Sequence, residues 1–193
     1  MLRKHFAYAA KAVGKPQPEL WVRATGSMAH VYLDRQGEPW LQERIEQVLP
    51  ALDEYMAASP FIRWWVTRLG DGELRLCEMF EDNHGPGFAV HTLREGAPMG
   101  KAPLSDQEAA ELFQMANHPD AGELLLFGSR DGDRVWNFLW EYGCHGGFEV
   151  EEQSAFLIQP SHLGPTSHGC DDVTPGDMNR FFERHYFGEV KAP

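Results

Sequence analysis

The chain has 193 residues, 42% of them apolar and 24% charged, which suits a single globular domain over residues 1–193. Twelve Phe, six Trp and five Tyr provide the bulk of a hydrophobic core, which excludes global disorder. No segment reaches the ~18 consecutive apolar residues typical of a membrane span, and Lys11 interrupts the N-terminal apolar run before a signal-peptide core could form. We therefore expect a soluble, cytoplasmic protein that does not enter a membrane.

The chain is acidic, with 29 Asp and Glu against 17 Lys and Arg and a net charge of −12. This balance argues against direct binding to a nucleic-acid backbone, which requires a positive surface. Two stretches, residues 102–129 and 141–177, contain acidic residues but no Lys or Arg. Either they form solvated surface that keeps the protein in solution, or they share a face that attracts a basic partner.

The first half of the chain predicts a short amphipathic helix over residues 1–11, then two strands and a second helix. Residues 19–24 and 28–33 are β-rich runs on either side of a tight turn. Apolar residues at helical spacing predict a helix from Pro39 to about Ala58. Pro50 interrupts this pattern, and we expect a kink or a break there.

The clearest hairpin comprises residues 61–69 and 73–80, which flank the turn Gly70–Gly72. The alternation in the first run predicts that one face of this strand packs on the core and the other faces solvent. Adjacent tryptophans, Trp64 and Trp65, then lie on opposite faces, and an exposed one would be an anchor for a partner. Alternatively, helices on both faces of the sheet would bury both rings.

The second half begins with a predicted strand over residues 88–93. Ser105 and Glu108 have the spacing of a capping box, which predicts a helix from there to about Asn117. A second hairpin follows between residues 123 and 142. Residues 148–159 predict either one long strand or a bulged pair, and a final helix begins at Pro175. This order of elements predicts an α+β fold.

We expect a mostly antiparallel sheet built of several hairpins, with about four helices packed on it.

A loop over residues 161–172 contains the strongest group of candidate metal ligands. Two imidazoles, a thiol and a carboxylate are ligand types that zinc accepts, and here they are His162, His168, Cys170 and Asp172. The spacing matches none of the usual structural zinc motifs. The alternative is that these side chains satisfy turns through hydrogen bonds to the backbone. We expect no cofactor, and zinc is the ion that this loop would hold if the chain binds one.

The leading functional hypothesis is an acidic interaction protein of the inhibitor or immunity type. Its carboxylates would bind a basic protein partner, such as one that handles nucleic acid, in the way that phosphates do. It leads because the catalytic motifs we sought, including a nucleophile elbow and a phosphate-binding loop, are incomplete or absent in the sequence. The predicted partner-binding residues are Glu149, Glu151, Glu152, Asp171 and Asp172, with a second patch at Glu108 and Glu111.

The alternative hypothesis is a small metal-dependent hydrolase. In this case the 161–172 loop would hold an ion that activates water, and Glu151 or Glu152 would act as the base. The sequence leaves the oligomeric state open.

Overall fold

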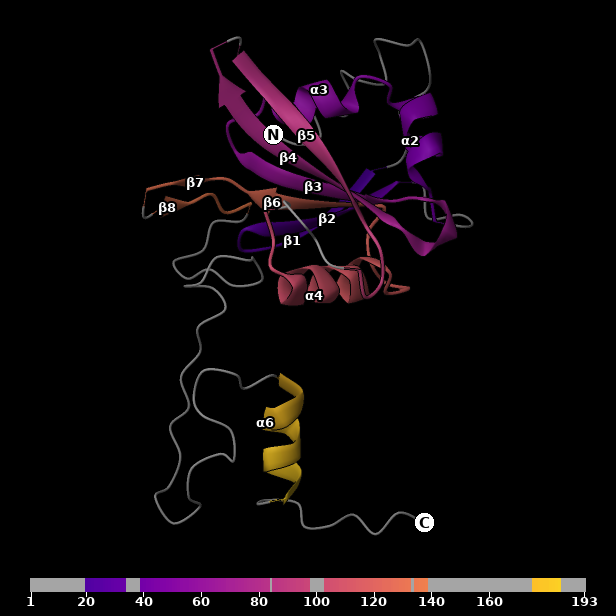
Figure 1. Ribbon diagram of the computed structural model, residues 1–193, viewed down its shortest axis with the longest axis vertical. Coiled ribbons are helices and arrows are strands. Elements are labelled where there is room, and N and C mark those ends of the chain that lie inside the picture. The colour runs from indigo at the N-terminus through magenta and orange to yellow at the C-terminus, as the bar shows by residue number, and fades with distance from the viewer. Residues whose placement is uncertain are drawn as a thin grey trace. The chain divides into compact units, whose positions relative to one another are not determined.

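The computed structural model describes residues 20–33, 39–83, 85–97, 103–132, 134–138 and 175–184 (Figure 1). The chain divides into two compact units, Met1–Ser154 and Ala155–Pro193. The second unit contributes helix α6 (Pro175–Phe182), which begins at the proline where the sequence predicts it. The prediction of a single domain over residues 1–193 stays a prediction.

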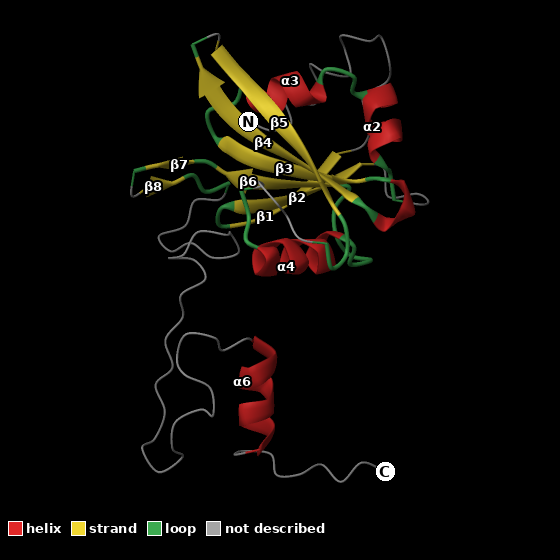
Figure 2. Ribbon diagram, in the orientation of Figure 1, coloured by secondary structure: helices red, strands yellow, loops and turns green. Residues whose placement is uncertain are grey.

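The first unit is built on a six-stranded sheet with the order β1-β2-β6-β3-β4-β5 (Figure 2). Every neighbouring pair is antiparallel, which confirms the predicted α+β class with its mostly antiparallel sheet. The strands are β1 (Leu20–Thr25), β2 (Met28–Leu33), β3 (Ile62–Arg68), β4 (Leu74–Asp82), β5 (Gly85–Leu93) and β6 (Leu124–Gly128).

Helices cover both faces of this sheet. Helices α2 (Gln42–Val48) and α3 (Leu52–Ala57) lie on one face, and α4 (Asp106–Ala116) lies on the other (Figure 1). The gap between α2 and α3 confirms the break predicted at Pro50, where the backbone N–H needed to continue the helix is missing.

Both tryptophans of β3 are buried, Trp65 under α2 and α3 and Trp64 under α4. The expectation that one face of β3 meets solvent is therefore wrong, and the alternative of a sheet covered on both faces is confirmed. The physical reason is the central position of β3, between β4 and β6, where both faces lie beneath helices.

Strand β6 pairs with β2 and β3 in the middle of the sheet, where all five of its residues are buried. The predicted hairpin between residues 123 and 142 appears within the described part only as a small ribbon of β7 (Arg130–Asp131) and β8 (Arg134–Val135). A strand that is apolar on both faces is stabilised more by the centre of a sheet than by an edge hairpin.

One carboxylate fastens α3 to the sheet. Asp53 Oδ1 accepts a hydrogen bond from Trp65 Nε1 at 2.7 Å, and Arg75 donates to both carboxylate oxygens at 3.2 and 2.6 Å. The side chains of Arg75 and Asp53 are only 12% and 17% exposed. This pairing fixes α3 against β3 and β4.

The predicted strand within residues 148–159 lies outside the described residues. In the part of the chain that the structure describes, no helix combines the length and the apolar character needed to cross a membrane.

Candidate functional site

The site lies along α4, and its position depends first on how that helix begins. Ser105 Oγ accepts a hydrogen bond from the Glu108 N–H at 3.2 Å, and Glu108 Oε2 accepts one from the Ser105 N–H at 2.7 Å. This reciprocal pair confirms the predicted capping box. The Glu108 carboxylate is therefore occupied at the helix N-terminus.

The C-terminal end of α4 is held by β3. Arg68 Nη1 donates a hydrogen bond to the Ala116 carbonyl oxygen at 2.8 Å, which satisfies one of the free carbonyls of the last turn. The chain then turns, because the His118 N–H donates to Met115 O and the Ala121 N–H donates to His118 O. The turn places His118 and Asp120 beside the end of the helix.

Strand β2 anchors this turn through two side chains. The Tyr32 hydroxyl donates to the Asp120 carbonyl oxygen at 2.9 Å, and the Gly122 N–H donates to His30 Nδ1 at 3.1 Å. Glycine is required at position 122, because a Cβ there would lie 2.7 Å from the Val31 carbonyl oxygen. The turn therefore has a fixed place against the sheet.

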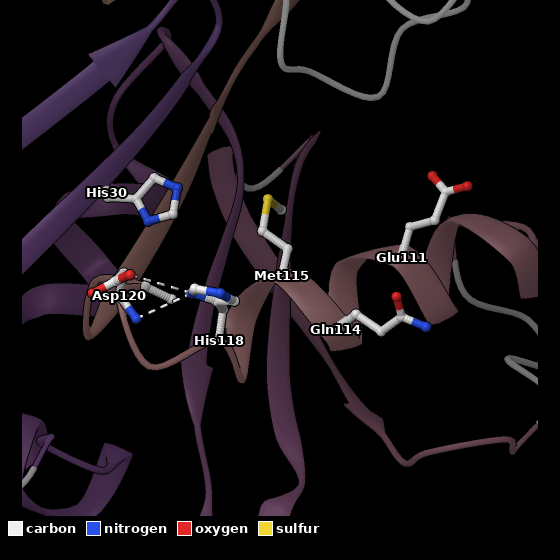
Figure 3. Close-up of a pocket in the computed structure, with 7 residues that line it drawn as sticks. His30, Glu111, Gln114, Met115, His118 and Asp120 are labelled. Carbon is white, nitrogen blue, oxygen red and sulfur yellow. Dashed lines mark hydrogen bonds and ion pairs between the residues drawn. The ribbon is translucent and has the colours of Figure 1, made fainter. Parts of the chain in front are cut away.

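A surface pocket of about 470 Å³ lies between α4, this turn and β2. Figure 3 shows His30, Met115 and His118 gathered near Asp120, while Glu111 and Gln114 lie along the helix. Among the residues that the structure describes, no Lys or Arg lines it, and those that do are His30, Glu111, Gln114, Met115, His118, Asp120 and Ala121. The lining thus combines two carboxylates, two imidazoles, an amide and apolar surface.

In both imidazoles, Nδ1 accepts a hydrogen bond from a backbone N–H. Burial lowers the pKa of His30, which favours the neutral ring, and its Nδ1 accepts from Gly122, so its proton is on Nε2. His118 Nδ1 accepts from the Asp120 N–H at 3.2 Å. The negative charge of the pocket therefore comes from Glu111 and Asp120.

Both pocket carboxylates are available to a ligand. Glu111 is exposed, and its Oε1 accepts one hydrogen bond from Gln107 Nε2 at 3.1 Å. The Asp120 side chain is 91% exposed, and its Oδ2 lies 3.9 Å from His118 Nδ1. These exposed carboxylates attract cations. The neutral imidazole of His30 adds a ring surface for stacking and a single N–H donor.

The structure divides the acidic residues of the 102–129 stretch by role. Glu111 and Asp120 line the pocket, and Glu108 caps α4. Glu123 is buried and accepts a hydrogen bond from the Leu33 N–H at 2.8 Å. Some carboxylates of this stretch therefore stabilise the fold, and only the others form an accessible acidic surface.

Of the predicted partner-binding residues, the structure places Glu108 and Glu111 on α4 and brings Glu111 to the pocket. The predictions that lie outside the described residues are Glu149, Glu151, Glu152, Asp171 and Asp172, together with the metal-ligand candidates His162, His168 and Cys170. Among the residues that are described, no group of three or more His, Cys, Asp or Glu side chains could hold a metal ion.

Cys77, the one described cysteine, lies in the core. Burial raises the pKa of its thiol to about 12, which leaves it protonated and weakly nucleophilic at neutral pH. The other two cysteines, Cys144 and Cys170, lie outside the described residues.

Sequence reasoning missed most of the residues that line the pocket. His30 is one polar position in a short strand, and its place opposite the α4–β6 turn follows from pairing between β2 and β6. The sequence His118-Pro119-Asp120, directly after the end of α4, was the available signal, because proline and aspartate favour a turn there.

No protein-family model, curated protein or solved structure matches this chain.

Proposed function

We propose that this protein is an acidic interaction protein that binds a basic protein partner through α4 and the pocket beside it. The observation that carries the proposal is the lining of this pocket, to which the described part of the chain contributes two carboxylates and no basic side chain. A surface of this kind favours the approach of positive groups and speeds their association.

The position of the pocket supports recognition of a partner at a defined site rather than non-specific attraction by the net charge alone. Its walls come from β2, α4 and the turn that follows α4, and each is fixed by hydrogen bonds to the sheet or to a helix end. A preorganised site loses less conformational entropy on binding than a mobile one. The carboxylates therefore present a defined pattern of charge to a partner.

The test is affinity capture of partners from the cells that make the protein, with two charge-reversal variants. Glu111→Lys reverses a pocket charge. Glu43→Lys is the matched control, because Glu43 is an exposed residue of α2, on the opposite face of the sheet, and also accepts a hydrogen bond from a glutamine. Both variants change the net charge equally.

We expect a basic protein that wild type and Glu43→Lys retain, that Glu111→Lys loses, and that salt elutes. Equal retention by all three proteins would contradict the proposal, since binding would then not depend on the pocket. Equal loss in both variants would contradict it too, because only net charge would then matter.

A further inference from the structure

The pocket beside α4 carries a carboxylate at each end. Glu111 lies in the middle of α4, and Asp120 lies in the turn beyond the helix. The helix ends at Ala116, five positions after Glu111, and Asp120 lies past this end (Figure 3). At the rise of an α-helix, the part of α4 from Glu111 to Ala116 alone spans about 7.5 Å. One guanidinium is too short to contact both carboxylates.

The surface between the carboxylates is mainly apolar and aromatic. Met115 projects there from α4, and the imidazoles of His30 and His118 lie close by (Figure 3). Because His30 is held neutral, its ring does not repel a cation. Such a surface accepts the aliphatic stems of long side chains or a proline ring.

We propose that the pocket binds an extended segment of the basic partner in which two arginine side chains, three positions apart, pair with Glu111 and Asp120. The proposal rests on the function proposed above and specifies the recognised chemistry. In a polyproline-II segment, residues three apart project from the same side and lie about 9 Å apart, which is comparable to the span of α4 from Glu111 to its C-terminal end. Arginine suits the site because its planar guanidinium stacks on rings and pairs with carboxylates.

An exposed cation on β1 limits the direction of approach. Arg23 of β1 pairs with His30 in the sheet register and is exposed, but it does not line the pocket. Its charge repels an arginine on the β1 side, so the segment follows α4. Replacing Arg23 with alanine should therefore strengthen binding about twofold, as expected for an exposed charge.

The test uses synthetic peptides and the full-length protein. The probe is the hexapeptide Pro-Arg-Pro-Pro-Arg-Pro, compared with two versions in which one arginine is citrulline, its neutral isostere. A fourth peptide places the arginines two positions apart. Binding is followed by the NMR signal of the Met115 methyl group, assigned with Met115→Leu. The protein variants are Glu111→Gln and Asp120→Asn, which keep the side-chain shape and remove the charge.

We expect a saturable shift of the Met115 signal with a Kd on the order of 1 mM, and about threefold to fivefold weaker binding for each citrulline peptide. In Glu111→Gln one citrulline position should lose its effect, and in Asp120→Asn the other position should lose its effect. This reciprocal coupling assigns each arginine to one carboxylate.

Three results would overturn the inference: no shift of the Met115 signal, equal binding of citrulline and arginine peptides, or equal coupling of both positions to both carboxylates. Equal binding of the peptide with the shorter spacing would overturn it as well. If any of these occurs while partner capture still depends on Glu111, the two-arginine mode fails and the proposed function stands. Loss of the Glu111 dependence in the capture experiment contradicts the proposed function itself.

Discussion

His30 shows how one side chain serves both the fold and the site. Its Nδ1 accepts the Gly122 N–H, which fixes the turn, while its ring forms part of the pocket. Its ring also packs near Tyr32, the second anchor of the same turn. A charged imidazole would lose both solvation and the lone pair that holds Gly122, so this position favours the neutral form.

This preference predicts a pH dependence of stability. Burial lowers the pKa of His30 below the ordinary value of 6.5, so the unfolded chain takes up a proton there before the folded chain does. The free energy of unfolding should therefore fall as the pH drops through about 6.5 towards the folded pKa. His30→Asn keeps an acceptor for the Gly122 N–H but cannot titrate, and it should lose this part of the dependence.

The measurement is urea unfolding of wild type and His30→Asn at about pH 7.5 and about pH 5.5. Glu111, His118 and Asp120 line the same pocket as His30, Arg23 pairs with His30 in the strand register, and all four are the same in both proteins. His118→Asn, which removes a largely exposed histidine, is the control. An identical fall in stability in wild type and His30→Asn would refute this account of His30.

At the scale of the element, α4 separates structural from accessible carboxylates. Ser105→Ala removes the hydroxyl that accepts the Glu108 N–H and should destabilise the protein by about 1 kcal/mol. Glu111→Ala removes an exposed side chain and should change stability by less than about 0.5 kcal/mol. Thermal melts of the two variants test this contrast, and a larger loss for Glu111→Ala would show that the division of roles is wrong.

The attachment of α3 depends on Asp53 in a comparable way. Asp53→Ala leaves the Trp65 N–H and the Arg75 guanidinium without their acceptor, and it should cost about 2–4 kcal/mol. Glu54→Ala, an exposed neighbour on the same helix, should cost less than about 0.5 kcal/mol. Denaturant titration of both variants provides the comparison. Similar values for the two would mean that Asp53 does not fasten α3 to the sheet.

At the scale of the whole molecule, local sequence signals predicted which helices and strands form better than they predicted which faces of these elements are buried. The turn at Gly26 predicted the β1–β2 pair, the proline at position 50 predicted the gap between α2 and α3, and the capping box predicted α4. Each is a short-range effect of backbone freedom or hydrogen bonding. The burial of both faces of β3 depends instead on helices distant in sequence, so alternation alone gave the wrong environment.

The pocket was harder to predict for the same reason. His30 and Gly122 are 92 positions apart, and their contact exists only once β2 pairs with β6. The sequence marked the 102–129 stretch as acidic but could not distinguish a buried acceptor such as Glu123 from an exposed charge such as Glu111. Composition thus predicted the sign of the surface charge, and the fold decided which carboxylates are accessible.

The most direct test of a basic partner at the pocket is site-specific photo-crosslinking in the cells that make the protein. A photoreactive amino acid replaces Gln114, which is exposed and lines the pocket, and in the control it replaces Gln47, which is exposed on α2. Mass spectrometry then identifies the crosslinked peptides. We predict that position 114 captures one protein within a segment rich in arginine or lysine and that position 47 does not. The same crosslinks from both positions, or an acidic or apolar segment at position 114, would contradict the proposed function.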